Sequence, residues 1–184
     1  MLVAVTLLNK TSGKLALPIF WEIISKWPTA LHLSKATIPE LVCILRRIGM
    51  QTVRAKRLVA LSSAYLADPP SVYDPRPSRD FNSPPRTQTF EKGDTSCLTS
   101  SPISHLPGVG RYALDSYRIF CMSHDDPKSG EWKKAQPSDK QLALYLKWKW
   151  AVDEHMQWHP TNGATGPIDA DYTHALIEEL EDKL

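Results

Sequence analysis

One stretch of the chain combines residue types that could bind an anion with a carboxylate close by. Residues 106–118 read LPGVGRYALDSYR, where Gly108 and Gly110 lead directly into a predicted helix. Glycine permits positive φ and close backbone approach, so the amides of residues 108–110 can turn toward one point ahead of the helix N-terminus. Those amides, the positive end of the helix dipole and the side chain of Arg111 suit a phosphate oxygen. The stretch predicts a clamp on a nucleic-acid backbone, although a Pro-Gly turn is also an ordinary connector between helices.

Short helices must position this stretch. Apolar residues recur every four positions at Leu15, Ile19, Ile23 and Trp27, which predicts a buried stripe. Brief turns with capping signals separate such segments, and alternating strand patterns are missing, so we expect an all-α fold. The capping signals are two predicted capping boxes, which start at Thr37 and Ser138, and a terminating glycine, Gly49. The expected helices cover residues 1–8, 12–27, 37–48, 52–66, 112–123, 138–156 and 170–184, with a short segment over 30–35 between the second and third.

Composition changes abruptly after Ala67. Residues 67–102 are rich in Pro, Ser, Thr, Asp and Arg and have almost no apolar periodicity, which predicts a long disordered Pro-rich insertion. A partner-binding or phosphorylated segment is the alternative. Residues 158–167 predict a loop before an acidic C-terminal helix. We therefore expect one domain over 1–157, interrupted by 67–102, and a loop and acidic tail over 158–184.

Composition limits the remaining possibilities. The chain has 184 residues, the length of one domain or of one domain with a tail, and its net charge of +2 does not by itself indicate nucleic acid. Cys43, Cys97 and Cys121 lie far apart and the histidines lack ligand spacing, so we expect no disulfide framework and no metal site. The apolar N-terminal residues are too few to span a bilayer, and we expect no membrane anchor.

The continuation LPGVGRYALDSYRIFC resembles the helix-hairpin-helix and catalytic-aspartate segment of the helix-hairpin-helix DNA glycosylase superfamily. It is most similar to the thymine/uracil glycosylase domains of methyl-CpG-binding-domain protein 4 and its fungal and plant relatives. The resemblance covers roughly residues 1–66 and 103–155, and implies the helix-hairpin-helix glycosylase fold. Further matches, in the same order, are residues 8–14, 48–50, 54–56, 64–66, 131–134 and 148–150. The family's domain has more residues before the first helix, including part of the base pocket, so the chain is expected to be N-terminally short.

The resemblance implies a chemistry for Asp115, which matches the family's catalytic aspartate. Breaking the bond between base and deoxyribose builds positive charge on the sugar, as in glycoside hydrolysis, and a fixed carboxylate stabilises that charge and orients the attacking water. An aspartate near a helix start that only serves the helix dipole is the alternative. Bifunctional members carry a Schiff-base lysine where this chain has Tyr112, so the implied enzyme is monofunctional.

A glycosylase must also extrude its target nucleotide from the stack. Lys10 stands where the family has an arginine that fills the vacated space, and Met50 where it has a wedging leucine; a solvated cation and an ordinary apolar residue are the alternatives. Tyr65 stands at a base-pocket tyrosine but could be a core residue, and Asn9 could face the pocket or cap the next helix. The predicted DNA contacts are Lys10, Met50, Arg54, Lys56, Gly108, Val109, Gly110 and Arg111, with Arg57 a further exposed phosphate contact; the predicted base pocket is Asn9, Tyr65 and Tyr112.

The resemblance implies a monofunctional DNA glycosylase of base-excision repair that needs neither a metal nor a cofactor. We expect hydrolysis of the N-glycosidic bond of mispaired thymine or uracil (G·T, G·U), with double-stranded DNA bearing a flipped pyrimidine as the partner. A monomer in the nucleus is expected. The alternatives are a catalytically inactive or truncated helix-hairpin-helix DNA-binding module, and a fragment that does not fold independently.

Overall fold

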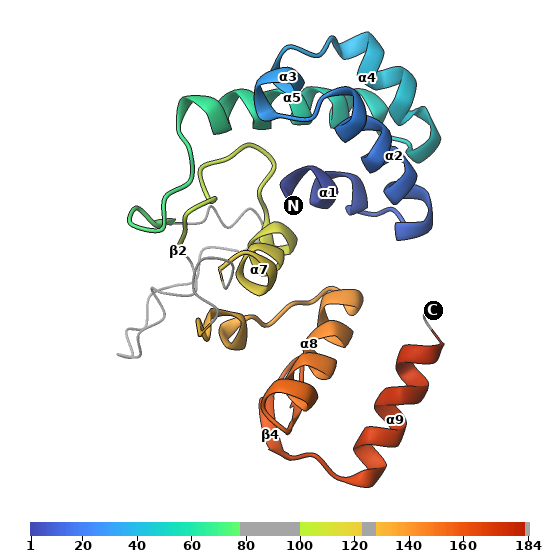
Figure 1. Ribbon diagram of the computed structural model, residues 1–184, viewed down its shortest axis with the longest axis vertical. Helices are drawn as coiled ribbons and strands as arrows, with labels where there is room; N and C mark the ends of the chain where they lie inside the picture. The colour runs from blue at the N-terminus through green and yellow to red at the C-terminus, as the bar shows by residue number, and fades with distance from the viewer. Residues whose placement is uncertain (78–99, 123–127, 183–184) are drawn as a thin grey trace, which may run out of the picture. The chain divides into compact units, whose positions relative to one another are not determined.

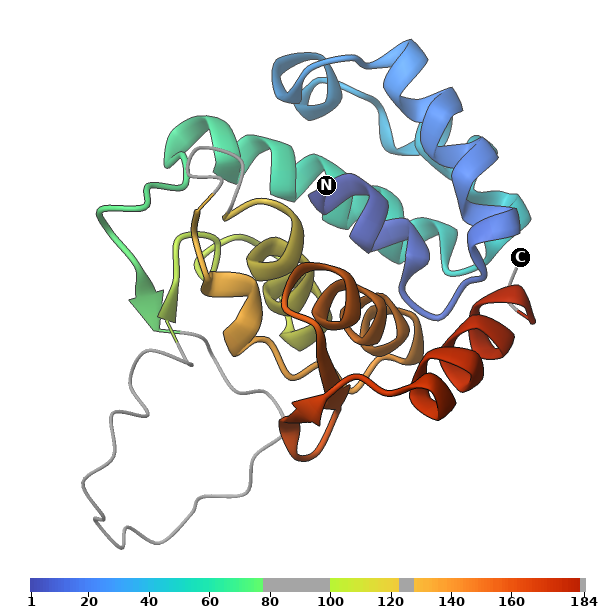
Figure 2. The ribbon, with the colours of Figure 1, turned by 60° about the horizontal axis from the view of Figure 1, so that its bottom comes forward.

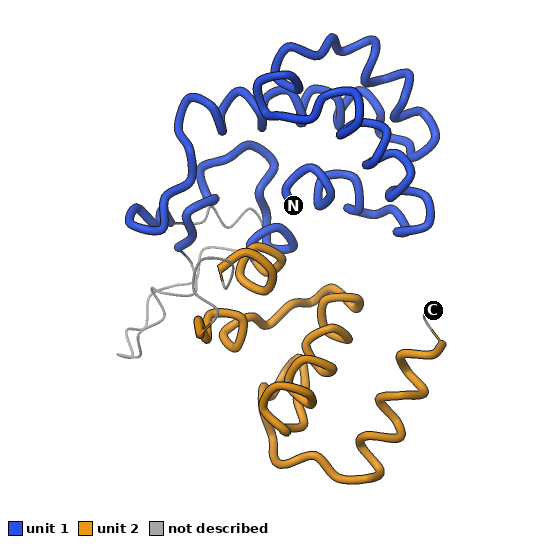
Figure 3. Tube along the Cα trace, in the orientation of Figure 1, with its two compact units in different colours: residues 1–114 blue, residues 115–184 orange. Residues whose placement is uncertain are grey.

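The computed structural model describes residues 1–77, 100–122 and 128–182. The chain forms two compact units, Met1–Leu114 and Asp115–Leu184 (Figure 3). Both are mostly helical, in agreement with the predicted helical fold (Figure 1). The described part also contains two short antiparallel strand pairs that the sequence did not predict. No helix in these described ranges is both long enough and apolar enough to cross a membrane.

The first unit is built around helix α5. It contacts α1, α3 and α4, and runs alongside α1 in both ribbon views (Figures 1 and 2). The helices of this unit are α1 (Leu2–Leu8), α2 (Gly13–Lys26), α3 (Ala30–Ser34), α4 (Ile38–Leu45), a 3-10 turn (Arg46–Ile48) and α5 (Gln51–Ala67). Its largest fully buried core side chains are Leu7, Ile19, Ile23, Leu41, Leu45 and Leu58. This core fixes α1 and α5, which carry most of the predicted site.

The helix ends lie close to where the sequence predicted them, whereas one predicted buried face is partly wrong. Thr37 and Glu40 form the predicted capping box, and a hydrogen bond from Thr37 is the main cause that lowers the pKa of Glu40. The expected stripe on α2 is wrong at Leu15, which is 58% exposed. Ala16 is buried instead, because the inward face of α2 follows 16, 19 and 23 rather than strict spacing of four.

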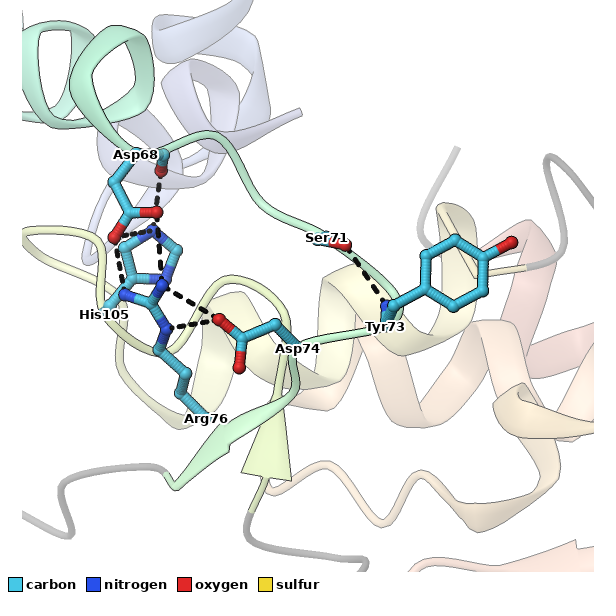
Figure 4. A network of polar contacts seen from close by, with 6 residues as sticks. All are labelled: Asp68, Ser71, Tyr73, Asp74, Arg76 and His105. Carbon is cyan, nitrogen blue, oxygen red and sulfur yellow. Dashed lines mark hydrogen bonds and ion pairs between the residues drawn. The ribbon is translucent and has the colours of Figure 1, made fainter.

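A network of hydrogen bonds and ion pairs joins the residues just after α5 to one another and to His105 (Figure 4). Arg76 donates to both carboxylate oxygens of Asp68, at 2.5 and 3.1 Å, and to Asp74 at 2.9 Å. His105 Nε2 lies 2.8 Å from the Asp68 carbonyl oxygen, so the ring is oriented to donate from that nitrogen. The hydrogen bonds from Arg76 lower the pKa of Asp68.

The predicted insertion is narrower than expected. Strand β1 (Arg76–Pro77) pairs with β2 (Ser100–Ser101), so both ends of the predicted 67–102 segment belong to the fold. Residues 78–99, where disorder was also predicted, lie outside the described residues.

Helix α7 (Arg111–Phe120) begins in the first unit and continues into the second. The second unit also contains a 3-10 turn (Glu131–Lys134), α8 (Lys140–Asp153), strands β3 (Met156–His159) and β4 (Gly163–Pro167), and α9 (Ala170–Glu181). The cap of α8 is Asp139, not the predicted Ser138, because the Asp139 carboxylate accepts from the amides of residues 141 and 142.

The loop predicted over 158–167 is wrong, since β3 and β4 form a hairpin there. Trp158 of this hairpin is buried, and its backbone hydrogen-bonds to the Tyr172 hydroxyl of α9. Lys147 of α8 pairs with Glu179 at 2.6 Å. The buried Trp158 and these contacts make α9 part of the second unit rather than a loose tail.

Candidate functional site

The glycine turn before α7 has a defined geometry. Gly108 adopts φ +81°, as its residue type predicts, whereas Gly110 does not adopt positive φ. The Val109 amide donates to the Leu106 carbonyl oxygen at 3.3 Å, and Gly110 O accepts from the Leu114 amide at 3.0 Å as the helix starts. The predicted cluster of three ligand-facing amides is therefore reduced, because the turn itself uses the N–H of Val109.

Arg57 of α5 packs directly against this turn. A Cβ added to Gly108 would overlap the Arg57 Cδ and lie 2.9 Å from its Cγ and Nε. Arg57 was expected to stay in solvent, but it is half-buried along the turn. Gly108 is thus required both for its backbone conformation and for the close approach of a cationic side chain.

The turn, α1, α5 and the start of α7 enclose a cavity of about 190 Å³ within the first unit. Its lining residues are Val5, Thr6, Asn9, Arg57, Gly108, Gly110, Arg111, Tyr112 and Ala113. The cavity brings together six predicted site residues from three separate parts of the sequence, around positions 9, 57 and 108–112. Two arginines, an asparagine and a tyrosine are among the lining residues, and side chains of these types can bind an anionic, ring-bearing ligand.

Asp115, the predicted catalytic residue, lies one helical turn after Arg111 in α7. The boundary between the two units falls inside this helix, between Leu114 and Asp115. Asp115 is 8% exposed and is not among the residues that line the cavity, and its neighbour Ser116 is buried as well. A carboxylate sheltered from bulk water interacts more strongly with a positive charge that develops beside it.

Lys10 and Met50 occupy two loops with unusual backbones. Both residues are left-handed, at φ 58° and 51°, and both are exposed. Such conformations are uncommon for residues with a side chain and are found mainly at turns and functional sites. The positions are compatible with the predicted DNA contacts.

Arg54 requires a correction. It was predicted to be an exposed phosphate contact, but it is 4% exposed. Its guanidinium donates to the carbonyl oxygens of Ile48 (2.7 Å), Gly49 (3.2 Å) and Asn9 (2.8 Å), and to Thr11 Oγ1 (2.6 Å). Burial lowers the pKa of Arg54, and the charge of Arg57 lowers it further. Arg54 therefore stabilises protein loops instead of facing a phosphate.

The other predicted residues are not gathered at the cavity. Tyr65 is 44% exposed near the end of α5, and Lys56 is exposed; neither lines the cavity. Val5, Thr6 and Ala113 also line the cavity but were not predicted to do so. Their types carry no chemical signal, because their place at the cavity follows from the packing of α1 against α5. Within the described ranges, no group of three or more metal-binding side chains occurs.

Comparison with known proteins gives the chain a distant relationship to DNA glycosylases. No family model matches the chain. It is 29% identical over 126 residues to a protein of Pyrobaculum aerophilum named thymine/uracil-DNA glycosylase, covering 68% of this chain and 45% of that protein. It is 25% identical over 144 residues to the methyl-CpG-binding domain protein 4-like protein of Arabidopsis thaliana, covering 78% of this chain and 24% of that protein. The chain thus spans less than half the length of each.

Proposed function

We propose that this chain is a monofunctional DNA glycosylase with a helix-hairpin-helix clamp, which hydrolyses the N-glycosidic bond of mispaired thymine or uracil opposite guanine. The observation that carries the proposal is the cavity in which the glycine turn, Asn9, Arg57, Arg111 and Tyr112 meet. The distant similarity to a protein named thymine/uracil-DNA glycosylase supports the choice of reaction and of pyrimidine.

Binding begins with the sugar–phosphate backbone. The amides of Gly108 and Gly110 and the start of α7 offer partial positive charge, and Arg57 and Arg111 add full charges. Contacts to phosphate fix the position of a protein on duplex DNA but carry little sequence information. Lys10 and Met50 enter the stack from their exposed loops and fill the space that the extruded nucleotide leaves.

Asp115 supplies the carboxylate for bond cleavage. As the bond between C1′ and the base nitrogen breaks, positive charge develops on the sugar, and the carboxylate stabilises it. Asp115 orients a water molecule that adds to C1′; the base leaves with the bonding electrons and takes up a proton. Asn9 and Tyr112 hold the extruded base by hydrogen bonding and ring contact.

The product of this reaction is an abasic site in an uncut strand. Tyr112 stands at the place of an amine nucleophile, so no Schiff base forms and the strand is not cleaved. Hydrolysis of this kind requires neither a metal nor an organic cofactor. The protein is proposed to act as a monomer on nuclear DNA.

Labelled duplexes containing G·T, G·U or G·C test the proposal. Incubation with the chain followed by hot alkali should cut the mismatched strands at the pyrimidine, and omission of alkali should leave them intact. Asp115→Asn should abolish the alkali-dependent cut, while Asp171→Asn, at an exposed aspartate in the first turn of α9, should leave it unchanged. Strand breaks without alkali would contradict the monofunctional mechanism. Tight binding to DNA without abasic sites would identify a DNA-binding module without catalysis.

A further inference from the structure

Two exposed loops of the first unit are joined by a single buried side chain. The loop at Asn9–Thr11 and the loop at Ile48–Met50 are separated by almost forty residues of sequence. Arg54 lies in the first turn of α5 and donates from Nη2 to the first loop and from Nη1 to the second. The spacing between the loops therefore depends on one planar group.

Each loop presents its exposed residue in a left-handed backbone conformation. Lys10 lies between Asn9 and Thr11, the two acceptors of Nη2, and Met50 directly follows Gly49, an acceptor of Nη1. Left-handed backbone is unfavourable for a residue with a Cβ, and glycine would relieve it at either position. Both side chains are exposed, so packing in the core does not account for their types. Their placement is better explained by contact with a partner.

The geometry of Arg54 suits a rigid link. The four donor–acceptor distances lie between 2.6 and 3.2 Å, and the group is sheltered from water. Charge-assisted bonds in such a place are stronger than neutral ones. In addition, the Arg54 amide donates to the Met50 carbonyl oxygen at 2.9 Å, so α5 itself holds the second loop.

We propose that Arg54 is a positioning residue that fixes Lys10 and Met50 as one two-pronged wedge for extruding a mispaired nucleotide from duplex DNA. This inference rests on the proposed function. Arg54 touches neither the substrate nor the reacting atoms, and it acts through the spacing of the two prongs. Lysine cannot replace it, because one ammonium group cannot bridge four acceptors on two loops.

Three variants test the role of Arg54. Arg54→Lys keeps the charge and loses the bridge, and Thr11→Val removes one acceptor. Arg76→Lys is the matched control, because Arg76 also makes several hydrogen bonds in the first unit but does so beyond the far end of α5. Extrusion is followed by the fluorescence of 2-aminopurine placed beside the mispaired thymine, together with single-turnover base release and thermal melting.

Arg54→Lys should slow both extrusion and base release about tenfold, as expected from the loss of charged hydrogen bonds. Thr11→Val should slow both about threefold, and affinity for matched duplex should change less than about twofold in either variant. The control should extrude and release base as the parent does. Parental extrusion rates in both Arg54→Lys and Thr11→Val would overturn the proposal. If Arg54→Lys does not melt cooperatively, Thr11→Val alone decides.

A mutant-cycle comparison distinguishes an effect of Arg54 on the placement of Lys10 and Met50 from an effect on the stability of the whole chain. In a chain already carrying Lys10→Ala and Met50→Ala, the change Arg54→Lys should have little further effect on extrusion, because the prongs it positions are gone. A further loss of about tenfold in that background would refute a role through the wedge.

Measurements on the unsubstituted chain distinguish a failure of this inference from a failure of the proposed function. If it brightens 2-aminopurine but releases no base, the glycosylase proposal fails, while Arg54 is still judged by the fluorescence of its variants. If the parent neither brightens the probe nor releases base, both proposals are overturned.

Discussion

Gly108→Ala is the sharpest test of the turn, because the structure distinguishes two ways in which this substitution lowers the stability of the fold. The first is backbone strain, since alanine must adopt φ +81°. The second is steric, since the new methyl group overlaps the middle of the Arg57 side chain. The Arg57 side chain must shift from Cγ outward and is only half-buried, whereas the backbone of the turn leads into α7 and cannot relax as easily. The strain should therefore dominate the loss of stability.

The expected magnitude follows from this assignment. A left-handed backbone costs an alanine about 1–2 kcal/mol relative to glycine. For a chain of this size, each kcal/mol lowers the melting temperature by about 2–4 °C. The displaced Arg57 also leaves its place in the cavity, which should weaken binding to duplex DNA about tenfold if it contacts phosphate.

Gly110→Ala is the matched control. An added Cβ at Gly110 meets no atom within 4 Å among the described residues, and its φ is not positive. We expect parental melting for this variant. The double variant Gly108→Ala with Arg57→Ala should melt as low as Gly108→Ala, because removing the obstacle does not relieve the strain. Equal melting temperatures for Gly108→Ala and Gly110→Ala would refute the reasoning, and full recovery in the double variant would show that the steric cost dominates.

Three further outcomes are expected. Asp115→Asn should reduce single-turnover base release by at least about a hundredfold, the scale of lost acid–base and electrostatic catalysis, with DNA affinity in gel-shift assays nearly unchanged. Lys10→Ala and Met50→Ala should each slow extrusion more than they weaken binding to matched duplex, and equal effects in both assays would count against the wedge. Asp68→Asn should lower the melting temperature at neutral pH, because Arg76 lowers the pKa of Asp68 in the folded chain. Stability from such a group is present above its unfolded pKa and lost as pH falls through the folded value, so the difference should disappear in acid, and a constant difference at all pH values would contradict this account.

Local signals in the sequence predicted most of the helices. The capping box at Thr37 and the glycine at 49 mark ends that the structure confirms within a few residues. The hairpin over 156–167 could not be predicted this way, because its strands lack clean alternation. It forms because Trp158 finds a buried place and the Tyr172 hydroxyl bonds to its backbone. Such tertiary contacts override weak local preference.

In the candidate site, too, features set by local sequence were predicted, and features set by tertiary contacts were not. Gly108 was predicted from the demands of a turn, which are local, and the structure confirms its positive φ. The place of Arg54 was not predictable from the sequence, because an arginine on a helix next to Lys56 and Arg57 is more often exposed. Only the approach of two distant loops supplies enough carbonyl oxygens to hold a guanidinium out of water.

The two arginines also explain why α5 lies at the centre of the first unit. Arg54 and Arg57 are three residues apart, so their side chains leave α5 on neighbouring positions of one surface. The first holds the loops of Lys10 and Met50, and the second supports the turn at Gly108 and lines the cavity. Leu58, fully buried one turn after Arg54, packs this part of α5 into the core. A rotation of α5 about its axis would therefore disturb the wedge loops and the glycine turn together, so their relative placement depends on the packing of one helix.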